Sequence, residues 1–412
     1  MTLIVQKYGG TSVANIERIK NVAARAIATH RAGNRVVVAV SAMAGETDRL
    51  VALVEGITHT YSRREYDVVV SAGEQVSIGL LAIAIEAQGC KAKSYLGWQV
   101  RFMTDSSFSK ARIQEVEGEK IHRDLQAGYI VVVAGFQGID NEGSVTTLGR
   151  GGSDTSAVAL AAALKADRCD IYTDVDGVYT TDPRIEPKAR KLDQISYDEM
   201  LEMASLGAKV LQTRSVELAK KYSVPVRVLS SLEEGTGTLL TEENATMEQV
   251  LVSGITYSKN EAKITVVGVP DRPGVAAAVF GALSGANINV DMIIQNVSAS
   301  GETDLTFTVP KSDFRQALGV LEGSIGKIGA REIRGNSEIA KISAIGVGMR
   351  SHSGVAQKMF DALSRESINI QMISTSEIKI SVVLDEKYTE LAVRTLHDAF
   401  DLGKESGDHI TR

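Results

Sequence analysis

Residues 147–164 (TLGRGGSDTSAVALAAAL) combine a glycine-rich turn, two charged side chains and a strong helix former. Several backbone N–H groups and the positive end of the helix dipole face one point in such a turn, which favours a bound anion. Ser153, Asp154 or Thr155 could cap the helix. Arg150 and Asp154, four residues apart, could form an ordinary surface ion pair or face a ligand. We favour a ligand site, because the glycines beside Arg150 would expose the pair.

A second glycine turn follows an apolar run at residues 5–12 (VQKYGGTS), with Lys7 just before Gly9 and Gly10. The glycines allow the backbone to approach a phosphate, and the lysine adds a point charge. The pattern is not a P-loop, because GxxxxGK[ST] is absent. A solvated lysine before a β-turn would explain this motif alone, but two such turns together favour a phosphate-binding site.

Three further motifs expose polar side chains in turns. Residues 40–48 (VSAMAGETD) expose Ser41 and Thr47, and residues 71–79 (SAGEQVSIG) expose Glu74, which on its own is explained most simply as a first-turn helix acid. Residues 172–184 (YTDVDGVYTTDPR) carry spaced acidic side chains. Their spacing is superficially similar to that of a calcium loop, but the glycine and the distal glutamate of that loop are out of place.

The elements that must position these turns follow from the hydrophobic pattern. Up to about residue 230, the β-branched runs LIVQKYGG, RVVVAVSA, YIVVVAGF, CDIYTDV and PVRVLSS alternate with helical stretches at 15–32, 74–89, 153–166 and 209–222. This alternation predicts an α/β domain with a mostly parallel sheet and helices on both faces. The following residues are polar and rich in Gly, Thr and Glu, which is typical of a linker.

The second half contains an internal repeat. KITVVGV at 263–269 matches KISAIGV at 341–347, and residues 274–293 match residues 354–373. Each copy shows the βαββαβ pattern of a ferredoxin-like unit. Such a pair could merely hold subunits together, but beside an enzyme-like domain it more often binds a small regulator. The predicted domains are 1–232 (catalytic), 233–248 (linker), 249–337 (first repeat) and 338–412 (second repeat).

Composition excludes several classes of protein. The chain has 412 residues, a net charge of −6 and 5% aromatic residues, which argues against a nucleic-acid partner. Cys90 and Cys169 are too few for a disulfide framework or a structural zinc site, which fits a reducing compartment. No apolar run approaches 18 residues, and the N-terminus lacks a signal-peptide layout. We therefore expect a cytoplasmic protein with no membrane partner.

The motifs KYGGTS, VSAMAGETD, SAGE, TLGRGGSDTSA, TDVDGVYTTDPR and AKVLQTRSVELAKKY, in this order, resemble those of aspartate kinase, a family with the amino-acid kinase fold. The downstream repeat resembles its pair of ACT domains. The resemblance implies transfer of the γ-phosphoryl group of ATP to the side-chain carboxylate of L-aspartate, giving 4-phospho-L-aspartate at the first step of the lysine, threonine and methionine pathway. A carboxylate is already ionised at pH 7, so the site needs no general base and must hold two anions in line.

The resemblance also implies a role for each motif. Lys7 and Asp154 are the catalytic residues: Lys7 stabilises the transferred group, and Asp154 positions Lys7 or Mg²⁺. Glu74 binds the α-ammonium group of aspartate and Arg150 its α-carboxylate. The Mg²⁺ of MgATP is held mainly by the nucleotide phosphates, and no metal site of the protein itself is predicted. The substrate set is Ser41, Thr47, Glu74, Arg150, Gly151, Gly152 and Ser153, and the ATP set is Lys7, Tyr8, Gly9, Gly10, Thr173, Asp174, Tyr179, Asp182, Arg184, Lys209 and Val210.

Each repeat offers the same two features to an amino-acid effector. The turn before its first helix (DRPGVA or SHSGVA) presents N–H groups to a carboxylate, and the start of the next strand (NVD or NIQ) presents polar groups to an amino group. Lysine, threonine or both are the expected feedback inhibitors. The predicted effector set is Asp271, Gly274, Val275, Ala276, Asn289, Val290, Asp291, Gln295, Val355, Ala356, Asn369, Ile370 and Ser376.

Two alternative functions share parts of this pattern. Another amino-acid kinase, such as a glutamate or N-acetylglutamate kinase, would share the sheet and glycine turns, but we do not expect it to combine Glu74, GRGGSD and a paired ACT repeat. A non-catalytic amino-acid sensor would be expected to have lost Lys7 or Asp154. ACT sheets usually pair, so we expect self-association. Met247 could also begin a shorter regulatory subunit, or be an ordinary linker residue.

Overall fold

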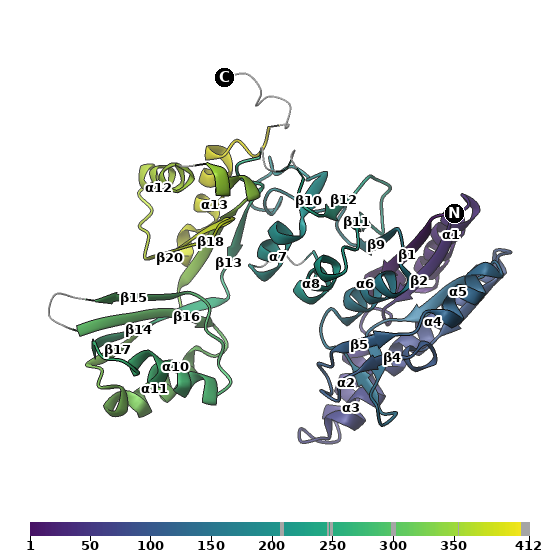
Figure 1. Ribbon diagram of the computed structural model, residues 1–412, viewed down its shortest axis with the longest axis horizontal. Helices are drawn as coiled ribbons and strands as arrows, with labels where there is room; N and C mark the ends of the chain where they lie inside the picture. The colour runs from purple at the N-terminus through teal and green to yellow at the C-terminus, as the bar shows by residue number, and fades with distance from the viewer. Residues whose placement is uncertain (207–209, 245–246, 248–249, 298–301, 353, 405–412) are drawn as a thin grey trace. The chain divides into compact units, whose positions relative to one another are not determined.

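The computed structural model describes residues 1–206, 210–244, 247, 250–297, 302–352 and 354–404 (Figure 1). The chain forms two compact units. The N-terminal unit contains Met1–Val178 and Lys191–Met247, and the C-terminal unit contains Tyr179–Arg190 and Glu248–Arg412. The short segment Tyr179–Arg190 therefore interrupts the N-terminal unit in sequence and belongs to the C-terminal unit.

An eight-stranded sheet in the order β10-β12-β11-β9-β1-β2-β6-β3 forms the centre of the N-terminal unit. All its pairings are parallel except that between β11 and β12, so the predicted mostly parallel α/β sheet is confirmed. The strands are β1 (Leu3–Tyr8), β2 (Arg35–Val40), β3 (Ala92–Tyr95), β6 (Ile130–Ala134), β9 (Arg168–Thr173), β10 (Gln194–Ser196), β11 (Val226–Ser230) and β12 (Thr238–Thr241).

Helices bury both faces of this sheet, which explains why strands such as β2 and β6 are almost continuous apolar runs. All six residues of β1 are buried. Helices α1 (Ile16–Arg31) and α4 (Ala72–Ala87) share one core with Tyr8 and alternate residues of β2. Helix α6 (Gly152–Leu164) packs against β1 and against α8 (Thr213–Lys221). These helices lie within a few residues of the predicted ranges, apart from residue 209, which lies outside the described residues.

The remaining elements of the N-terminal unit surround this frame. A second, four-stranded sheet has the order β5-β4-β7-β8. These elements are η1 (Gly10–Val13), α2 (Glu46–Glu55), α3 (Arg63–Val70), η2 (Gly97–Val100), β4 (Phe102–Thr104), β5 (Ile113–Val116), α5 (Glu119–Gln126), β7 (Gln137–Ile139), β8 (Val145–Thr147) and α7 (Tyr197–Ser205).

One stretch of the described chain, Arg63–Ala87, is long and apolar enough to cross a membrane by length and composition. It contains two helices, α3 and α4. Within α4, Ile78, Leu81 and Ile85 pack into the core of the N-terminal unit. We interpret the stretch as a core helix and its neighbour, because these side chains already have partners in the protein.

The C-terminal unit contains two antiparallel four-stranded sheets, β15-β16-β14-β17 and β13-β18-β20-β19, which confirms the predicted pair of ferredoxin-like repeats. The first repeat contains β14 (Glu261–Pro270), α10 (Val275–Gly285), β15 (Ile293–Val297), β16 (Glu302–Pro310), α11 (Phe314–Ile328) and β17 (Glu332–Asn336). The second contains β13 (Gly254–Ser258), β18 (Ile339–Ile345), η3 (Val347–Ser351), α12 (Val355–Arg365), β19 (Met372–Thr375), β20 (Lys379–Asp385), η4 (Glu386–Tyr388) and α13 (Thr389–Ala399).

Strand β13 differs from the predicted division. It lies inside the range 249–337 expected for the first repeat, but it pairs with β18 in the sheet of the second, with Gly254 opposite Ile345. The first repeat has its own edge strand, β17, which pairs with β14. One strand of the second repeat, β13, therefore precedes the whole first repeat in sequence.

Candidate active site

The first two catalytic candidates form a buried ion pair. The Lys7 Nζ and Asp154 Oδ1 atoms lie 2.6 Å apart, and each side chain is 11% exposed. Lys7 lies near the end of β1, and Asp154 lies in the first turn of α6, which packs against that strand. The partner of Asp154 is therefore Lys7. Among the described residues, Arg150 forms no ion pair and its side chain is exposed.

The glycine turn before α6 has the strained geometry that its sequence predicts. Gly151, the N-cap residue, has a φ of 70°, and a Cβ there would lie 1.8 Å from the Cγ of Gln212. A Cβ at Gly149 would lie 2.8 Å from the carbonyl oxygen of Ser109. Among the described residues no side chain caps the helix, and the expected caps from Ser153, Asp154 or Thr155 do not form. The Gly152 N–H group donates a hydrogen bond of 2.9 Å to the Gly149 carbonyl oxygen, so the N–H groups of Ser153 and Asp154 are the first-turn donors that can face a ligand.

The second glycine turn lies close to the end of β2. A Cβ at Gly10 would lie 2.9 Å from the carbonyl oxygen of Ala42, and a Cβ at Gly9 would lie 3.3 Å from the Lys7 Nζ atom. The parallel strands β1 and β2 thus end beside each other, and the turn that follows β1 surrounds the lysine. Ligands bind at this edge of parallel sheets, outside the carboxyl ends of the strands.

Glu74 is a buried acid rather than a solvated helix cap. It lies in the first turn of α4 and is 2% exposed. Its Oε1 atom accepts a hydrogen bond of 2.9 Å from the Ala42 N–H group, while its Oε2 atom is buried and has no hydrogen-bond partner among the described residues. Desolvation raises the pKa of Glu74 to about 7, against the opposing effect of the Ala42 hydrogen bond. A buried carboxylate oxygen without a partner indicates a place for a cationic group.

The start of α2 lies beside Glu74. A Cβ at Gly73 would lie 2.7 Å from the Cβ of Ala42 and 3.4 Å from the Cγ of Glu46, so the first turns of α2 and α4 meet at the end of β2. Thr47 follows Glu46 in α2 and is half-buried, as is Ser41 at the end of β2. The structure thus brings the predicted substrate residues Ser41, Thr47 and Glu74 to one edge of the sheet.

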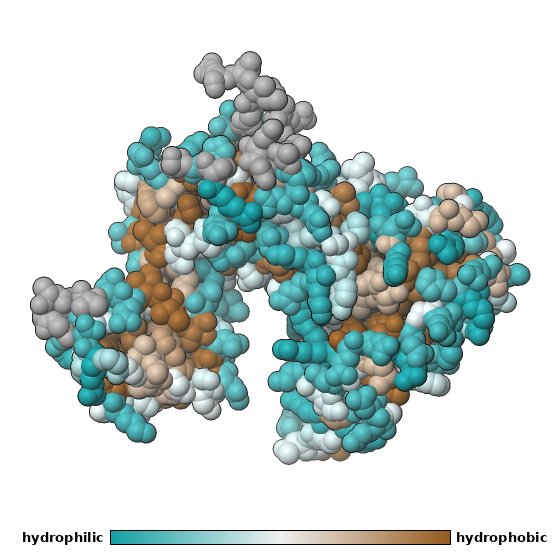
Figure 2. Space-filling view, in the orientation of Figure 1, coloured by the Kyte–Doolittle hydropathy of each residue, from teal (hydrophilic) through white to brown (hydrophobic). Residues whose placement is uncertain are grey.

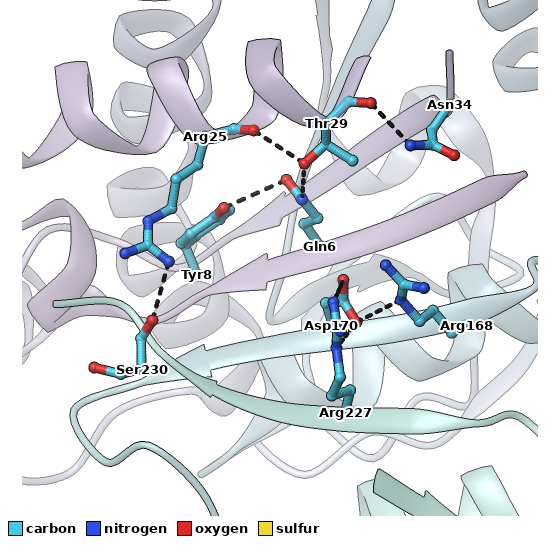
Figure 3. Close-up of polar contacts among 9 residues, drawn as sticks. All are labelled: Gln6, Tyr8, Arg25, Thr29, Asn34, Arg168, Asp170, Arg227 and Ser230. Carbon is cyan, nitrogen blue, oxygen red and sulfur yellow. Dashed lines mark hydrogen bonds and ion pairs between the residues drawn. The ribbon is translucent and has the colours of Figure 1, made fainter. Parts of the chain in front are cut away.

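Tyr8, a predicted ATP-binding residue, has a fully buried side chain. Its ring stacks on that of Tyr172, with centroids 4.5 Å apart. Its hydroxyl donates a hydrogen bond of 3.3 Å to Gln6 (Figure 3). Arg25 of α1 lies over the Tyr172 ring and donates a hydrogen bond to the Ser230 carbonyl oxygen. The Tyr8 carbonyl oxygen also accepts a hydrogen bond from the Ser41 N–H group, so the structure places this predicted ATP-binding residue within the sheet and its core.

This buried layer supports the strands that carry the site, and sequence motifs did not identify it. Asp170 of β9 is buried and pairs with Arg168 at 2.9 Å and with Arg227 of β11 at 3.0 Å (Figure 3). Tyr8 and Tyr172 lie opposite each other in neighbouring parallel strands. This layer depends on the pairing of β1 with β9, and sequence patterns do not specify which strands pair.

The predicted nucleotide residues fall in both units. Thr173 ends β9, and its hydroxyl donates a hydrogen bond of 3.1 Å to Asp174. Val210 is half-buried in the N-terminal unit, and Lys209 lies outside the described residues. Tyr179, Asp182 and Arg184 belong to the C-terminal unit, where Asp182 pairs with Arg184 at 2.7 Å and accepts a hydrogen bond from Tyr257.

Five of the predicted effector residues line one cavity of about 470 Å³ in the first repeat. Its helix α10 begins after Gly274, which has a φ of 96°, and no side chain caps it. The Thr303 hydroxyl is buried there without a hydrogen-bond partner among the described residues. The predicted lining residues are Asp271, Gly274, Val275, Ala276 and Gln295, and the others are Pro270, Arg272, Pro273, Thr303 and Leu305.

The other predicted effector residues lie elsewhere. Asn289, Val290 and Asp291 precede β15 and do not line the cavity. The Asp291 carboxylate forms an ion pair with the buried Lys341 of β18, which also pairs with Glu261. In the second repeat, Val355 and Ala356 begin α12 after Gly354, which also has a positive φ. Asn369, Ile370 and Ser376 flank β19.

Comparisons with known proteins agree with this arrangement. Residues 2–230 match the Amino acid kinase family, and residues 252–324 and 342–400 match the ACT domain. The chain is 61% identical to an aspartate kinase of Pseudomonas putida over 403 residues, or 98% of each chain. It is 60% identical to an aspartokinase of Pseudomonas aeruginosa over 404 residues, again 98% of each chain.

Two solved structures of E. coli aspartokinase III resemble it over nearly the whole chain. The complex with aspartate and ADP in the R-state has a TM-score of 0.80 at 28% sequence identity and covers 96% of this chain and 99% of that chain. The complex with lysine and aspartate in the T-state has a TM-score of 0.78 at 28% identity and covers 97% and 99% of the two chains.

Proposed function

Because the chain belongs to the aspartate kinases, we propose that it phosphorylates the side-chain carboxylate of L-aspartate at the edge of the sheet where Lys7, Asp154 and Glu74 lie. The observation that carries this assignment is the buried Lys7–Asp154 pair at the uncapped N-terminus of α6. Phosphoryl transfer between two anions needs fixed positive charge and N–H donors rather than a base. These residues supply both.

Lys7 neutralises the transferred phosphoryl group, and the N–H groups of the turns at Gly9 and Gly10 and at the start of α6 bind phosphate oxygens. Asp154 holds Lys7 in place through their ion pair. The carboxylate of Asp154 is also a hard oxygen ligand beside phosphate-binding N–H groups, which suits the Mg²⁺ of MgATP. When bound, Mg²⁺ neutralises charge on the nucleotide phosphates.

Glu74 and Arg150 recognise the amino-acid end of the substrate. The Oε2 atom of Glu74, which has no partner within the described residues, accepts a hydrogen bond from the α-ammonium group. Arg150, exposed beside the α6 turn, binds the α-carboxylate through its planar guanidinium group. Ser41 and Thr47 hydrogen-bond the same substrate. This division of roles places aspartate recognition on α2, α4 and the α6 turn, and phosphate recognition around Lys7.

An acyl phosphate reacts with hydroxylamine, so an ATP-dependent hydroxamate assay tests the proposal. Hydroxamate should form with aspartate and fail to form with glutamate or N-acetylglutamate. Hydroxamate from glutamate but not aspartate would instead indicate the alternative amino-acid kinase. A folded protein that forms none with any of these substrates would indicate the non-catalytic sensor.

The cavity of the first repeat is the proposed effector site. The uncapped start of α10 binds the effector carboxylate, and Asp271 and Gln295 bind its amino groups. Lysine, threonine or both are the proposed inhibitors, and a related aspartokinase of E. coli binds lysine in its T-state. Asp291 is a weaker candidate than its sequence suggested, because Lys341 already neutralises it.

Self-association is proposed to involve the outer faces of the two repeats. Figure 2 shows hydrophobic residues at the surface of the C-terminal unit, and Ile293 of β15 and Ile373 of β19, equivalent positions of the repeat, are 52% and 42% exposed. A second copy of the chain, or a shorter chain that starts at Met247, would cover them. The free thiols of Cys90 and Cys169 fit the proposed cytoplasmic location.

A further inference from the structure

The segment Tyr179–Arg190 is fastened to the second repeat by helix α13. Ile185 contributes to the core of that repeat, and its carbonyl oxygen accepts a hydrogen bond of 2.8 Å from the Arg394 Nε atom. Thr180 Oγ1 lies 3.0 Å from the His397 Nε2 atom and accepts another hydrogen bond from the Arg190 N–H group. This segment therefore contacts two side chains of α13, Arg394 and His397.

One ring nitrogen of His397 has no hydrogen-bond partner in the part of the chain that the structure describes. The residue is fully buried, and its Nδ1 atom has no hydrogen-bond partner within the described residues, while Nε2 contacts Thr180. Leaving a buried polar atom unpaired destabilises a fold, so such an atom calls for an explanation. Burial lowers the pKa of His397, which favours the neutral imidazole. A neutral ring that donates from Nε2 to Thr180 has a free lone pair on Nδ1.

Two carboxylates lie beside this imidazole. One ligand atom each from Glu186, His397 and Asp398 lies within 4.8 Å of the other two. Glu186 is buried, and its Oε1 atom accepts a hydrogen bond of 2.9 Å from the Lys188 N–H group, which fixes its carboxylate. Asp398 is exposed and pairs with the Lys188 Nζ atom at 3.1 Å. An exposed pair of this kind is weak, so a stronger cation could displace the lysine.

We propose that Glu186, His397 and Asp398 form a binding site for a divalent transition metal of the zinc class. One imidazole nitrogen and two carboxylate oxygens are a donor set that Zn²⁺ accepts, with water as the fourth ligand. Metal–ligand bonds of about 2.0–2.2 Å require the three ligand atoms to move closer together, and the exposed Asp398 can rotate to do so. The contact between Thr180 and His397 supplies the outer partner that orients a ligating imidazole.

This proposed site is distinct from the one proposed for the Mg²⁺ of MgATP. Its ligands are different residues, and they belong to the C-terminal unit, whereas Asp154 belongs to the N-terminal unit. Glu186 is about 200 residues away in sequence from the adjacent His397 and Asp398, which explains why no ligand spacing in the sequence predicted the site. A bound metal would join Glu186 of the segment Tyr179–Arg190 to the C-terminal helix of the second repeat. It would therefore hold that segment, which also carries Asp182 and Arg184, against α13.

Metal titration of the full-length chain, without nucleotide, tests the proposal. After treatment with a chelator, the protein is titrated with Co²⁺ by visible absorption and with Zn²⁺ by calorimetry. We expect one metal per chain, with displacement of Co²⁺ by Zn²⁺. Asp398→Asn changes an exposed side chain and should weaken binding roughly 10–100-fold or more, the range found when even outer partners of metal ligands are removed. Asp361→Asn, an exposed acid on α12, is the matched control and should bind as wild type.

A second variant tests a buried ligand, Glu186. Glu186→Gln keeps the side-chain shape and should also weaken binding, and Zn²⁺ should raise the thermal unfolding midpoint of wild type but not of Glu186→Gln or Asp398→Asn. The proposal is wrong if the wild-type chain takes up no Co²⁺ or Zn²⁺. It is equally wrong if both variants bind as wild type, because the metal would then be at another group such as His122 or Cys90.

Discussion

The proposed catalytic cluster and the proposed effector cavity of the first repeat share one local feature in different surroundings. Each has a glycine with positive φ before a helix that no side chain caps: Gly151 before α6 and Gly274 before α10. Around α6 the charged groups are buried and paired, as in the Lys7–Asp154 contact. Around α10 the polar lining residues Asp271 and Gln295 are exposed.

This difference matches what each site must do. Phosphoryl transfer gains from charges that are fixed before the reaction, because fixed charges need no reorganisation in the transition state. An effector that binds and leaves needs only a differential affinity of about 1–3 kcal/mol between two states. Exposed, adaptable groups are sufficient for that. The predicted effects of substitutions should therefore fall from the first site to the second.

The largest effect is expected at the buried pair. Lys7→Ala should lower kcat roughly 10²–10³-fold, about 2.7–4 kcal/mol, because a fixed charge at the phosphoryl group is lost. Asp154→Ala should act similarly, since Asp154 holds the lysine. Steady-state kinetics measures the loss, and circular dichroism verifies folding. Lys20→Ala, at an exposed lysine of α1, is the control. Near-normal turnover in a folded Lys7→Ala variant would contradict the assigned role.

A smaller and more selective effect is expected at Arg150. Arg150→Ala should mainly raise the KM for aspartate and leave the KM for ATP unchanged, because the guanidinium group is exposed beside the α6 turn and free to bind the α-carboxylate. Removal of a charged hydrogen bond of this kind costs about 1.5–3 kcal/mol, or roughly 10–150-fold in KM. If ATP affinity falls instead, the two subsites have been exchanged.

Sequence patterns predicted the elements but few of the side-chain contacts. The alternation of apolar runs and helix formers predicted the parallel sheet, because strands buried on both faces must be continuously apolar. The repeat predicted the two four-stranded sheets. The glycine turns were found because a positive φ limits the choice of residue.

The remaining features depend on contacts between distant segments. A first-turn acid such as Glu74 has the same sequence pattern whether it is solvated or buried. Its burial depends on packing against the end of β2, where the Ala42 N–H group bonds its carboxylate. Two further features join segments that are far apart in sequence. Strand β13 pairs with β18 across the whole first repeat, and Tyr179–Arg190 belongs to the C-terminal unit. Asp291 was assigned to an effector because nothing in the sequence indicates its partner Lys341.

The pH dependence of aspartate binding should reveal the burial of Glu74. Its pKa is raised to about 7 by desolvation, so the carboxyl is protonated below that pH and cannot pair with the α-ammonium group. The KM for aspartate should therefore fall as pH rises through 7, by about tenfold per pH unit on the acid side. Glu74→Gln should have a higher KM that does not change in this range.

The stability of the free protein should change in the opposite sense. Because burial favours the neutral form of Glu74, its contribution is complete below the ordinary pKa of 4.5 and is lost as pH rises through about 7. Denaturant unfolding of wild type and Glu74→Gln between pH 5 and pH 8 isolates this change. Parallel curves for the two proteins, with a pH-independent KM, would contradict a buried, titrating Glu74.

A substitution at Gln295 tests the proposed effector cavity around α10, whose polar lining residues are exposed. Gln295→Ala removes a lining side chain of the cavity in the first repeat and should raise the lysine or threonine concentration needed for half inhibition. The change should stay within the coupling range of about 5–150-fold and leave the uninhibited rate unchanged. Gln316→Ala, on α11 outside the cavity lining, should keep wild-type inhibition. If neither amino acid inhibits the wild-type enzyme at millimolar concentration, this cavity is not a feedback site for them.

The smallest effect on the full-length chain is expected for a substitution at Met247. This substitution tests whether the regulatory half is also translated as a separate, shorter chain. A chain that starts there would keep β13 and both four-stranded sheets, and with them the effector cavity. It would lack Tyr179–Arg190, and therefore the Ile185 side chain in the core of the second repeat. Glu242 and Glu243, which purine-rich codons could encode, stand before Met247 where a ribosome-binding site would lie.

Met247→Leu in the native gene separates a start codon from an ordinary linker residue. Met247 is buried, and its N–H group bonds to Asn244, but a Met-to-Leu change conserves volume and should cost less than about 1.5 kcal/mol. Activity of the full-length chain should be unchanged. A band with the mass of residues 247–412 should appear in wild type and vanish in the variant. If wild type gives no such band, the proposed self-association involves copies of the full chain, and another full-length copy is then the proposed cover for the exposed Ile293 and Ile373.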